Sequence, residues 1–274
     1  MNQRPNLRWR PTSMAHDLRH IWNGKLLVFE KPVLDATYVL GVDTAQGRGK
    51  DRSVIEVLRV GDLQRPDTQV AEYATDAKDP KQFAEVVAAV GRLYHGRDDE
   101  ALAVIERNTA GGGDLTLEDL RFRWGYTHLY SQKNLDSLTG VWSTTLGWYT
   151  GGTSRPKLAL AGQHAINEGY VQLHSPLLLE ELETFEGDGT IARAQAASGQ
   201  YDDRVMAFFL AHWGAHEDEW LSGADTQRAR LTMSPPPVDD STHVRPRQDF
   251  QNTDTTLDDY RDRSESVCAL LFGR

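Results

Sequence analysis

The sequence is poor in cysteine, in long apolar runs and in positive charge. Its single cysteine, Cys268, excludes a disulfide scaffold and an all-cysteine zinc site, and it favours a reducing cytoplasm. No apolar run approaches the ~20 residues of a membrane span, and the polar, basic residues 1–10 show no secretory signal. With 30 Lys and Arg against 40 Asp and Glu, the net charge is −10. This balance excludes general coating of nucleic acid, but not a nuclease, whose metal site is itself acidic.

The 274 residues have the composition of a globular protein, with 39% hydrophobic and 26% charged residues. Charge divides the chain into three parts. Residues 1–36 carry six basic and three acidic residues and are expected to form a basic N-terminal arm. Residues 215–274 carry seven basic and twelve acidic residues and few apolar ones, which is typical of a mobile acidic tail. Residues 37–214 are the expected folded domain.

This central part alternates between strand and helix patterns. Residues 38–43 are a short apolar run, and a turn rich in glycine and charge separates them from the β-branched residues 53–60, which predicts an antiparallel hairpin. Residues 80–93 have apolar side chains at helical spacing, with Asp79 as the expected N-cap and Pro80 at the first helical position. Further strands are expected at 69–75, 101–106 and 170–173, and further helices at 114–122, 157–168, 175–185 and 201–213.

Acidic residues stand where an apolar strand ends or a helix begins. Asp43 ends the first strand, where it shares a face with Gly41. Glu106 ends a later strand, and Asp202 and Asp203 open the last helix. An acid at the end of a buried strand costs free energy unless it is paired or binds a cation. If these acids converge, they form an oxygen-ligand site suited to Mg²⁺ or Mn²⁺, in which two ions hydrolyse a phosphodiester.

Each acid also has an ordinary structural interpretation. Asp202 or Asp203 is a natural N-cap, and Asp43 is suited to capping a turn. Glu106 has Arg107 next to it and can form a surface pair. The order of strand, hairpin and strand around these residues favours a joint role over four separate ones.

The acids lie in a series of segments whose order and spacing are specific only in combination. They are residues 39–47 (VLGVDTAQG) with 50–53, residues 104–108 (VIERN), the segments 147–150, 155–157 and 180–185, and residues 201–207 (YDDRVMA). This series resembles the nuclease domain of phage terminase large subunits: its first strand and hairpin, second acidic motif, intervening segment and third acidic motif. The third motif usually opens with His-Asp-Asp, and Tyr201 replaces the histidine here. The resemblance covers roughly residues 37–214.

The resemblance implies an RNase H-like α/β fold, a mixed central sheet flanked by helices with a cluster of acids at its centre. It also implies an endodeoxyribonuclease that cuts double-stranded DNA during viral genome packaging, in the cytoplasm of the infected host cell. In that role Asp43 bridges two Mg²⁺ or Mn²⁺ ions and Glu106 holds one of them. Asp203 or Asp202 completes the site, and the sequence does not choose between the two.

A full large subunit also carries an N-terminal ATPase with a phosphate-binding loop, and this sequence departs from that pattern. Gly49-Lys50 is followed by Asp51 where Ser or Thr is required, and Thr44 stands where the first glycine belongs. Residues 1–36 are too short for an ATPase. Either the sequence is an isolated nuclease fragment, or the motor lies on a separate chain. We therefore expect no ATP hydrolysis by these residues, and we name a separate ATPase motor chain, the small terminase and a portal as candidate partners.

Basic side chains near the acidic motifs are the candidates for contacts with DNA phosphate. They are Arg48, Lys50 and Arg52 in the glycine-rich turn, and Arg155 and Lys157 before a helix. For the turn, a solvated hairpin tip is an equal alternative.

The last expected helix carries two histidines one turn apart. His212 and His216 have the i, i+4 spacing of helical zinc ligands. No HExxH pattern accompanies them, and the helix is ending there, so we interpret them as structural or solvated.

Other functional classes share parts of this pattern. A RuvC-like junction resolvase or a transposase-like nuclease has the same acids but acts on branched or end-specific DNA, so the choice of substrate discriminates it. An actin-like or sugar-kinase-like nucleotide binder also begins with a strand, an Asp and a glycine-rich hairpin. That class needs a second phosphate loop and an adenosine pocket, which the sequence does not show. A nuclease-like domain that only binds DNA is the remaining alternative, and the retention of all the acids argues against it.

Overall fold

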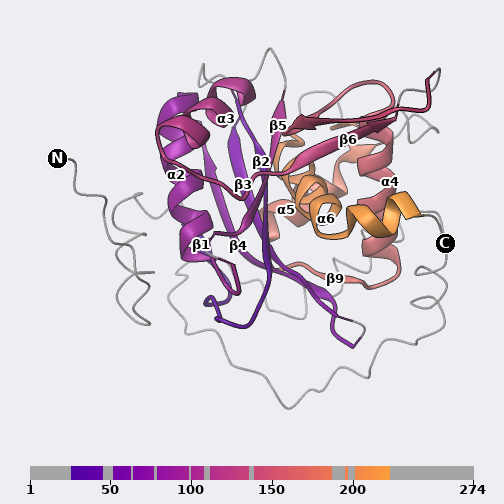
Figure 1. The fold of residues 1–274 in the computed structure, drawn as a ribbon. Coiled ribbons are helices and arrows are strands. Elements are labelled where there is room, and N and C mark those ends of the chain that lie inside the picture. The colour runs from indigo at the N-terminus through magenta and orange to yellow at the C-terminus, as the bar shows by residue number, and fades with distance from the viewer. Residues whose placement is uncertain are drawn as a thin grey trace.

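A mixed β-sheet lies between two layers of helices in the computed structural model (Figure 1). The structure describes residues 26–45, 52–62, 64–76, 79–98, 100–107, 112–135, 139–186, 195–196 and 201–222. One layer holds α2 (Pro80–Leu93) and α3 (Gly113–Phe122), and the other holds α4 (Ser154–Asn167), α5 (Pro176–Glu183) and α6 (Asp203–Ser222). None of the described helices is long and apolar enough to span a membrane.

The central sheet has the strand order β1-β4-β3-β2-β5-β8, with β9 beside β4. The bounds are β1 (Leu26–Val28), β2 (Tyr38–Asp43), β3 (Ser53–Arg59), β4 (Asp67–Thr75), β5 (Leu102–Arg107), β8 (Trp148–Tyr149) and β9 (Val171–Gln172). Strands β1 to β4 pair antiparallel, which confirms the predicted β2–β3 hairpin. The pairs β2–β5, β5–β8 and β4–β9 are parallel. The carboxyl ends of β2 and β5 therefore lie side by side.

Alternation along the strands divides the core into two apolar layers. Leu40 and Val42 of β2 face α2 and α3. Val39 of β2 and Val104 of β5 face α4, α5 and α6. The mixed α/β class with helices on both faces of the sheet, expected from the sequence, is confirmed.

Helix α2 begins and ends where the sequence predicts. The carboxylate of Asp79 accepts hydrogen bonds from the backbone N–H groups of Lys81 at 2.9 Å and Gln82 at 3.0 Å. Pro80 occupies the first turn, where a missing N–H costs nothing. The helix buries one apolar side, which includes Phe83, against the sheet.

Several short strands were not predicted. Strand β1 lies inside the expected N-terminal arm and pairs with β4 at the sheet edge. Strands β6 (Ser131–Leu135) and β7 (Trp142–Leu146) form a separate hairpin, and β10 (Phe185–Glu186) pairs with β11 (Gln195–Ala196). Such short strands carry little periodicity of their own. Strand β1 is defined by pairing with the distant β4, whereas the other four form two pairs between segments close in the sequence.

Two boundaries of the expected domains lie at the margins of the structure. Helix α6 continues to Ser222, past the expected end of the folded domain at 214. Residues 1–25 of the expected arm and 223–274 of the expected tail lie outside the described residues.

Candidate metal centre

Two of the predicted acids meet at adjacent strand ends. Strands β2 and β5 are parallel, with Val42 beside Ile105, so Asp43 and Glu106 follow at the same level. Both residues are buried, with 9% and 5% of their surface exposed. Their carboxyl groups are joined by a hydrogen bond. The structure thus brings together two acids that are 63 positions apart in the sequence.

Helix α6 crosses β2 at very short range beside these acids. A Cβ atom added to Gly41 would lie 1.8 Å from the carbonyl oxygen of Ala207 and 2.5 Å from the backbone nitrogen of Ala211. Glycine alone permits this approach of helix to strand. Gly41 and Asp43 share a face of β2, so the helix lies on the face where the Asp43 side chain points.

The start of α6 adds two further acids. Asp203 is the first residue of the helix, and its Oδ2 accepts a hydrogen bond from the backbone N–H of Arg52 at 3.2 Å. Asp202 stands immediately before it, and its carboxylate forms an ion pair with the guanidinium of Arg155 on α4. The two neighbours therefore have different surroundings.

The three other acids all act electrostatically on Asp43. Burial raises the pKa of Asp43 well above its ordinary value, and Glu106, Asp203 and Asp202 raise it further, in that order. Acids this close do not all ionise unless positive charge compensates them. A divalent cation supplies that charge and favours the ionised carboxylates. The donor set consists of carboxylate oxygens, so it fits Mg²⁺ or Mn²⁺.

Helix α3 begins directly against the end of β5 that carries Glu106. Gly112 adopts a left-handed φ of 88°, and a Cβ on Gly113 would lie 1.8 Å from the carbonyl oxygen of Glu106. The glycine-rich turn that the sequence shows here therefore lets the helix begin directly against β5. Arg107 strengthens this junction, because its guanidinium pairs with Asp114 in the first turn of α3.

The structure describes three of the five bases expected to contact DNA. Arg48 and Lys50 lie outside the described residues. Lys157 is exposed on α4. Arg155, on the first turn of the same helix, is half-buried against Asp202. The first turn of α4 thus places the positive charge of Arg155 next to Asp202.

Arg52 links the β2–β3 turn to the start of α6. Its guanidinium stacks over the ring of Tyr201, 4.8 Å from the ring centroid, and lies 4.0 Å from Glu181. Tyr201 is 40% exposed. The residue that replaces the usual histidine therefore contacts a base at the rim of the site.

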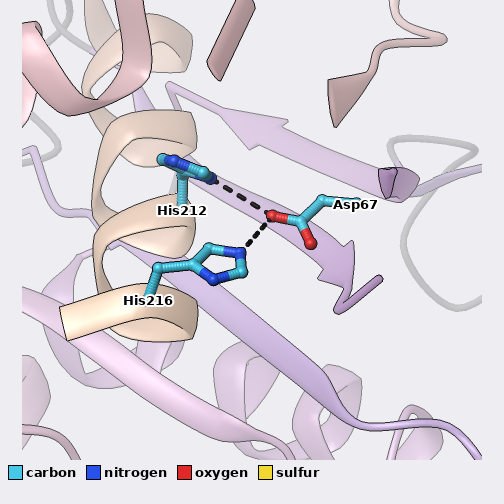
Figure 2. Close-up of side chains that lie close together, drawn as sticks. All are labelled: Asp67, His212 and His216. Carbon is cyan, nitrogen blue, oxygen red and sulfur yellow. Dashed lines mark hydrogen bonds and ion pairs between the residues drawn. The ribbon is translucent and has the colours of Figure 1, made fainter. Parts of the chain in front are cut away.

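A second group of ligand-type side chains lies further along α6 (Figure 2). His212 Nδ1 and His216 Nε2 lie 3.2 Å and 2.6 Å from the same oxygen, Oδ2 of Asp67 on β4. All three side chains are buried. The histidines are thus paired rather than solvated. The sequence shows their helical spacing but gives no signal for Asp67, which lies 145 residues before His212.

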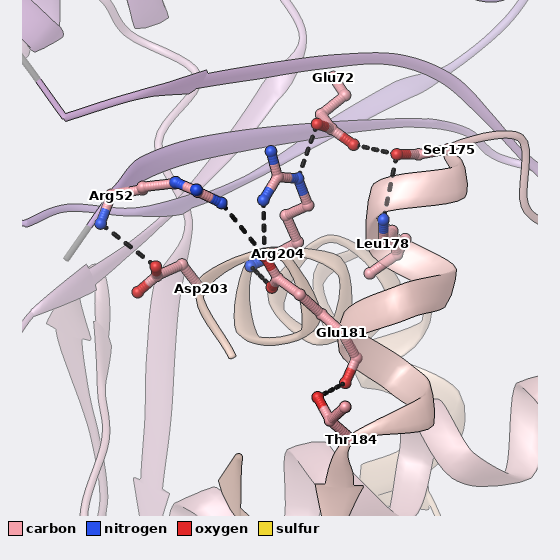
Figure 3. Close-up of polar contacts among 8 residues, drawn as sticks. All are labelled: Arg52, Glu72, Ser175, Leu178, Glu181, Thr184, Asp203 and Arg204. Atoms are coloured by element: carbon pink, nitrogen blue, oxygen red, sulfur yellow. Dashed lines mark hydrogen bonds and ion pairs between the residues drawn. The ribbon is translucent and has the colours of Figure 1, made fainter. Parts of the chain in front are cut away.

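Arg204, next to Asp203, is buried between two acids that sequence reasoning missed (Figure 3). Its Nε donates to Glu72 of β4 at 2.7 Å and its Nη1 donates to Glu181 of α5 at 2.6 Å. Its backbone N–H also donates to Glu181, at 2.8 Å. Ser175 donates its hydroxyl to Glu72. This network fixes the first turn of α6, and with it Asp203, to the sheet and to α5. A charged residue at the start of an otherwise apolar helix is the one sequence signal for it.

Comparison with known proteins bears on the fold. No family model and no curated protein matches this sequence. Two similar solved structures are the large terminase nuclease from thermophilic phage G20c with bound cobalt and the same nuclease with bound magnesium. The cobalt structure is 19% identical and the magnesium structure 15% identical. In both comparisons the match covers 69% of this chain and 87% of the other, with a TM-score of 0.50. The fold that the resemblance implies is thus confirmed: the chain shares the RNase H-like α/β fold of these phage large-terminase nucleases.

Proposed function

We propose that this chain is a metal-dependent endonuclease that cuts double-stranded DNA during viral genome packaging. The observation that carries the proposal is the convergence of Asp43, Glu106 and Asp203 at the ends of β2 and β5 and the start of α6. The nucleases that share the fold were solved with cobalt and with magnesium, which supports metal-dependent chemistry here.

The surroundings of the four acids support distinct roles. Asp43 lies against Glu106 and the two acids of α6, so we assign it to both ions. We assign Glu106 to one ion. For the remaining position we favour Asp203, because Asp202 is held by Arg155 and Asp203 acts more strongly on the pKa of Asp43. Two bound ions would activate a water molecule and stabilise the leaving oxygen of the phosphodiester.

The rest of the chain positions these carboxylates and the DNA. The buried Arg204 network holds Asp203 in place, and Gly41 sets the distance from α6 to β2. We assign backbone phosphate contacts to Arg52 and Lys157 at the rim, with Arg48, Lys50 and Arg155. Contacts of this kind position the duplex without reading base edges, so we expect little sequence specificity.

Genome packaging also needs an ATPase motor. These 274 residues hold no complete phosphate-binding loop, so we propose that the motor lies outside them, either in another part of a longer subunit or in a separate chain. The small terminase and the portal are the other proposed partners, and the cytoplasm of the infected host cell is the proposed place of action.

Nicking and linearisation of supercoiled plasmid with Mg²⁺ or Mn²⁺ tests the proposal. We expect metal-dependent cutting that EDTA abolishes and that is lost in Asp43→Asn, since one ligand of both ions loses its charge. Asp35→Asn is the matched control, because Asp35 is exposed and lies outside the acidic cluster. Cutting by Asp43→Asn at the control rate would refute the site.

A second arm of the same experiment addresses the substrate. Linear duplex, a four-way junction and single-stranded DNA are compared at equal concentration. Preference for the plain duplex supports the packaging role. A strong preference for the junction would instead support a RuvC-like resolvase with the same acids.

A further inference from the structure

The group formed by Asp67, His212 and His216 lies far from the acidic centre. In the sheet, Thr68 of β4 pairs with Arg59, which pairs with Tyr38 at the beginning of β2, whereas Asp43 is at the other end of that strand. Along α6, His212 lies nine positions after Asp203, which corresponds to about 14 Å of helix. The group is therefore a separate site, not part of the acidic cluster.

Its three potential ligand atoms already stand close to coordination distance. Asp67 Oδ2 lies 3.2 Å from His212 Nδ1 and 2.6 Å from His216 Nε2, and all three atoms lie within 4.8 Å of one another. In a tetrahedral zinc site with bonds of about 2.0–2.1 Å, ligand atoms lie about 3.3 Å apart. Small shifts of the side chains would therefore admit an ion.

The surrounding backbone holds this arrangement in place. The other carboxylate oxygen of Asp67, Oδ1, accepts a hydrogen bond from the backbone N–H of Gly61 at 2.8 Å. The backbone N–H of Asp67 donates to the carbonyl oxygen of Tyr170 at 2.9 Å. On α6 the backbone leaves helical geometry at His216, with φ −131° and ψ 19°. Supporting hydrogen bonds of this kind orient ligating groups in metal sites.

The three side chains are also shielded from solvent and chemically suited to one class of ion. Each of them is at most 4% exposed. Two imidazoles and one carboxylate suit zinc, cobalt or nickel, whereas the oxygen ligands of the acidic centre suit magnesium or manganese.

We propose that Asp67, His212 and His216 bind a zinc-type transition-metal ion that ties α6 to the β3–β4 turn. Three protein ligands leave a fourth position for solvent. Bound there, the ion would stabilise the end of α6 away from Asp203. The alternative is a metal-free cluster in which both imidazoles hydrogen-bond to Asp67, and the two arrangements differ in whether zinc stabilises the fold.

The test measures metal binding and thermal unfolding of the full chain after removal of bound metal with a chelator. With free Zn²⁺ at about 100 times its dissociation constant, we expect Tm to rise by roughly 5–10 °C. Co²⁺ as a probe should give the visible absorption of a four-coordinate ion. Both signals should persist in Asp43→Asn, which alters the acidic centre alone, and in the control His95→Gln, whose histidine lies beyond α2 on the other side of the sheet.

His216→Gln and Asp67→Asn should each lose the rise in Tm and the cobalt absorption. If both variants fail to fold, the wild type and Asp43→Asn still decide the matter. No rise in Tm and no bound Zn²⁺ in the wild type would establish the metal-free cluster and overturn the proposal. Loss of all Zn²⁺ binding in Asp43→Asn would overturn it as well, because the ion would then sit in the acidic centre. Neither result depends on whether the chain cuts DNA.

Discussion

Substituting Gly41 by alanine tests how closely α6 must approach the central strand. The new Cβ would lie 1.8 Å from the carbonyl oxygen of Ala207. Non-bonded contacts of this kind stay above about 3.0 Å, so the helix must move by about 1.2 Å. Overpacking of this kind costs about 1–3 kcal/mol of unfolding free energy, which corresponds to a fall in Tm of roughly 2–12 °C for a domain of this size.

The same displacement carries Asp203 away from Asp43 and Glu106. Because misplacement by about 1 Å costs roughly 100-fold in rate, we expect Gly41→Ala to lose plasmid cutting at temperatures where it is still folded. Gly152→Ala is the matched control, since a Cβ there meets nothing within 4 Å. Thermal unfolding by circular dichroism and the plasmid assay give the two readouts. Wild-type Tm and wild-type cutting in Gly41→Ala would refute the described contact between α6 and β2.

Three further changes test other parts of the structure. Arg204→Met leaves two buried acids without their partner and should cost about 3–5 kcal/mol in urea unfolding, whereas Arg65→Met, in an exposed pair, should change nothing measurable. Burial, and after it the charge of Glu100, raises the pKa of Tyr126. The stability that neutral Tyr126 contributes is therefore fully present below its unfolded pKa of about 10, and it is lost as the pH rises through the folded pKa. In Tyr126→Phe the free energy of unfolding should therefore fall less steeply with pH above pH 10 than in the wild type. A pH dependence identical to that of the wild type would contradict this. Lys157→Ala should weaken DNA binding and lower its salt slope by about 1, unlike Lys81→Ala on the opposite face of the sheet.

The Arg204 network explains why a costly buried arginine is placed beside the proposed catalytic acids. A buried ion pair contributes little net stability, because desolvation offsets the attraction. The ion pairs instead determine geometry, because the side chain and backbone N–H of Arg204 hold the start of α6 against Glu72 of β4 and Glu181 of α5. The neighbouring Asp203 is therefore held in position before any ion binds.

Local signals in the sequence predicted the regular elements well. Asp79 and Pro80 define the start of α2 because cap and fixed φ act within one turn. The apolar runs that end in Asp43 and Glu106 predicted both strands to within a residue. Strands β1, β6, β7, β8, β10 and β11 escaped prediction because each is at most five residues long and carries little periodicity. Strands β1 and β8 also depend on partners far along the chain, β4 and β5.

For the candidate site too, local signals identified the residues, whereas tertiary contacts distinguished their roles. Position at a strand end or helix start singled out Asp43, Glu106, Asp202 and Asp203, because an acid there needs a partner. The sequence left the choice between Asp202 and Asp203 open. The ion pair of Asp202 with Arg155 distinguishes their surroundings, and it arises only because α4 packs beside α6.

The sequence alone therefore determined the α/β class, the main strands and helices, and the acids that belong together. These depend on periodicity, capping and charge, which act over a few residues. Only the tertiary structure decided which acids are already paired, which arginine anchors α6, and that Asp67 meets His212 and His216. Those contacts join residues more than 20 and up to 149 positions apart, and the packing of helices on the sheet, not any local pattern, brings them into reach.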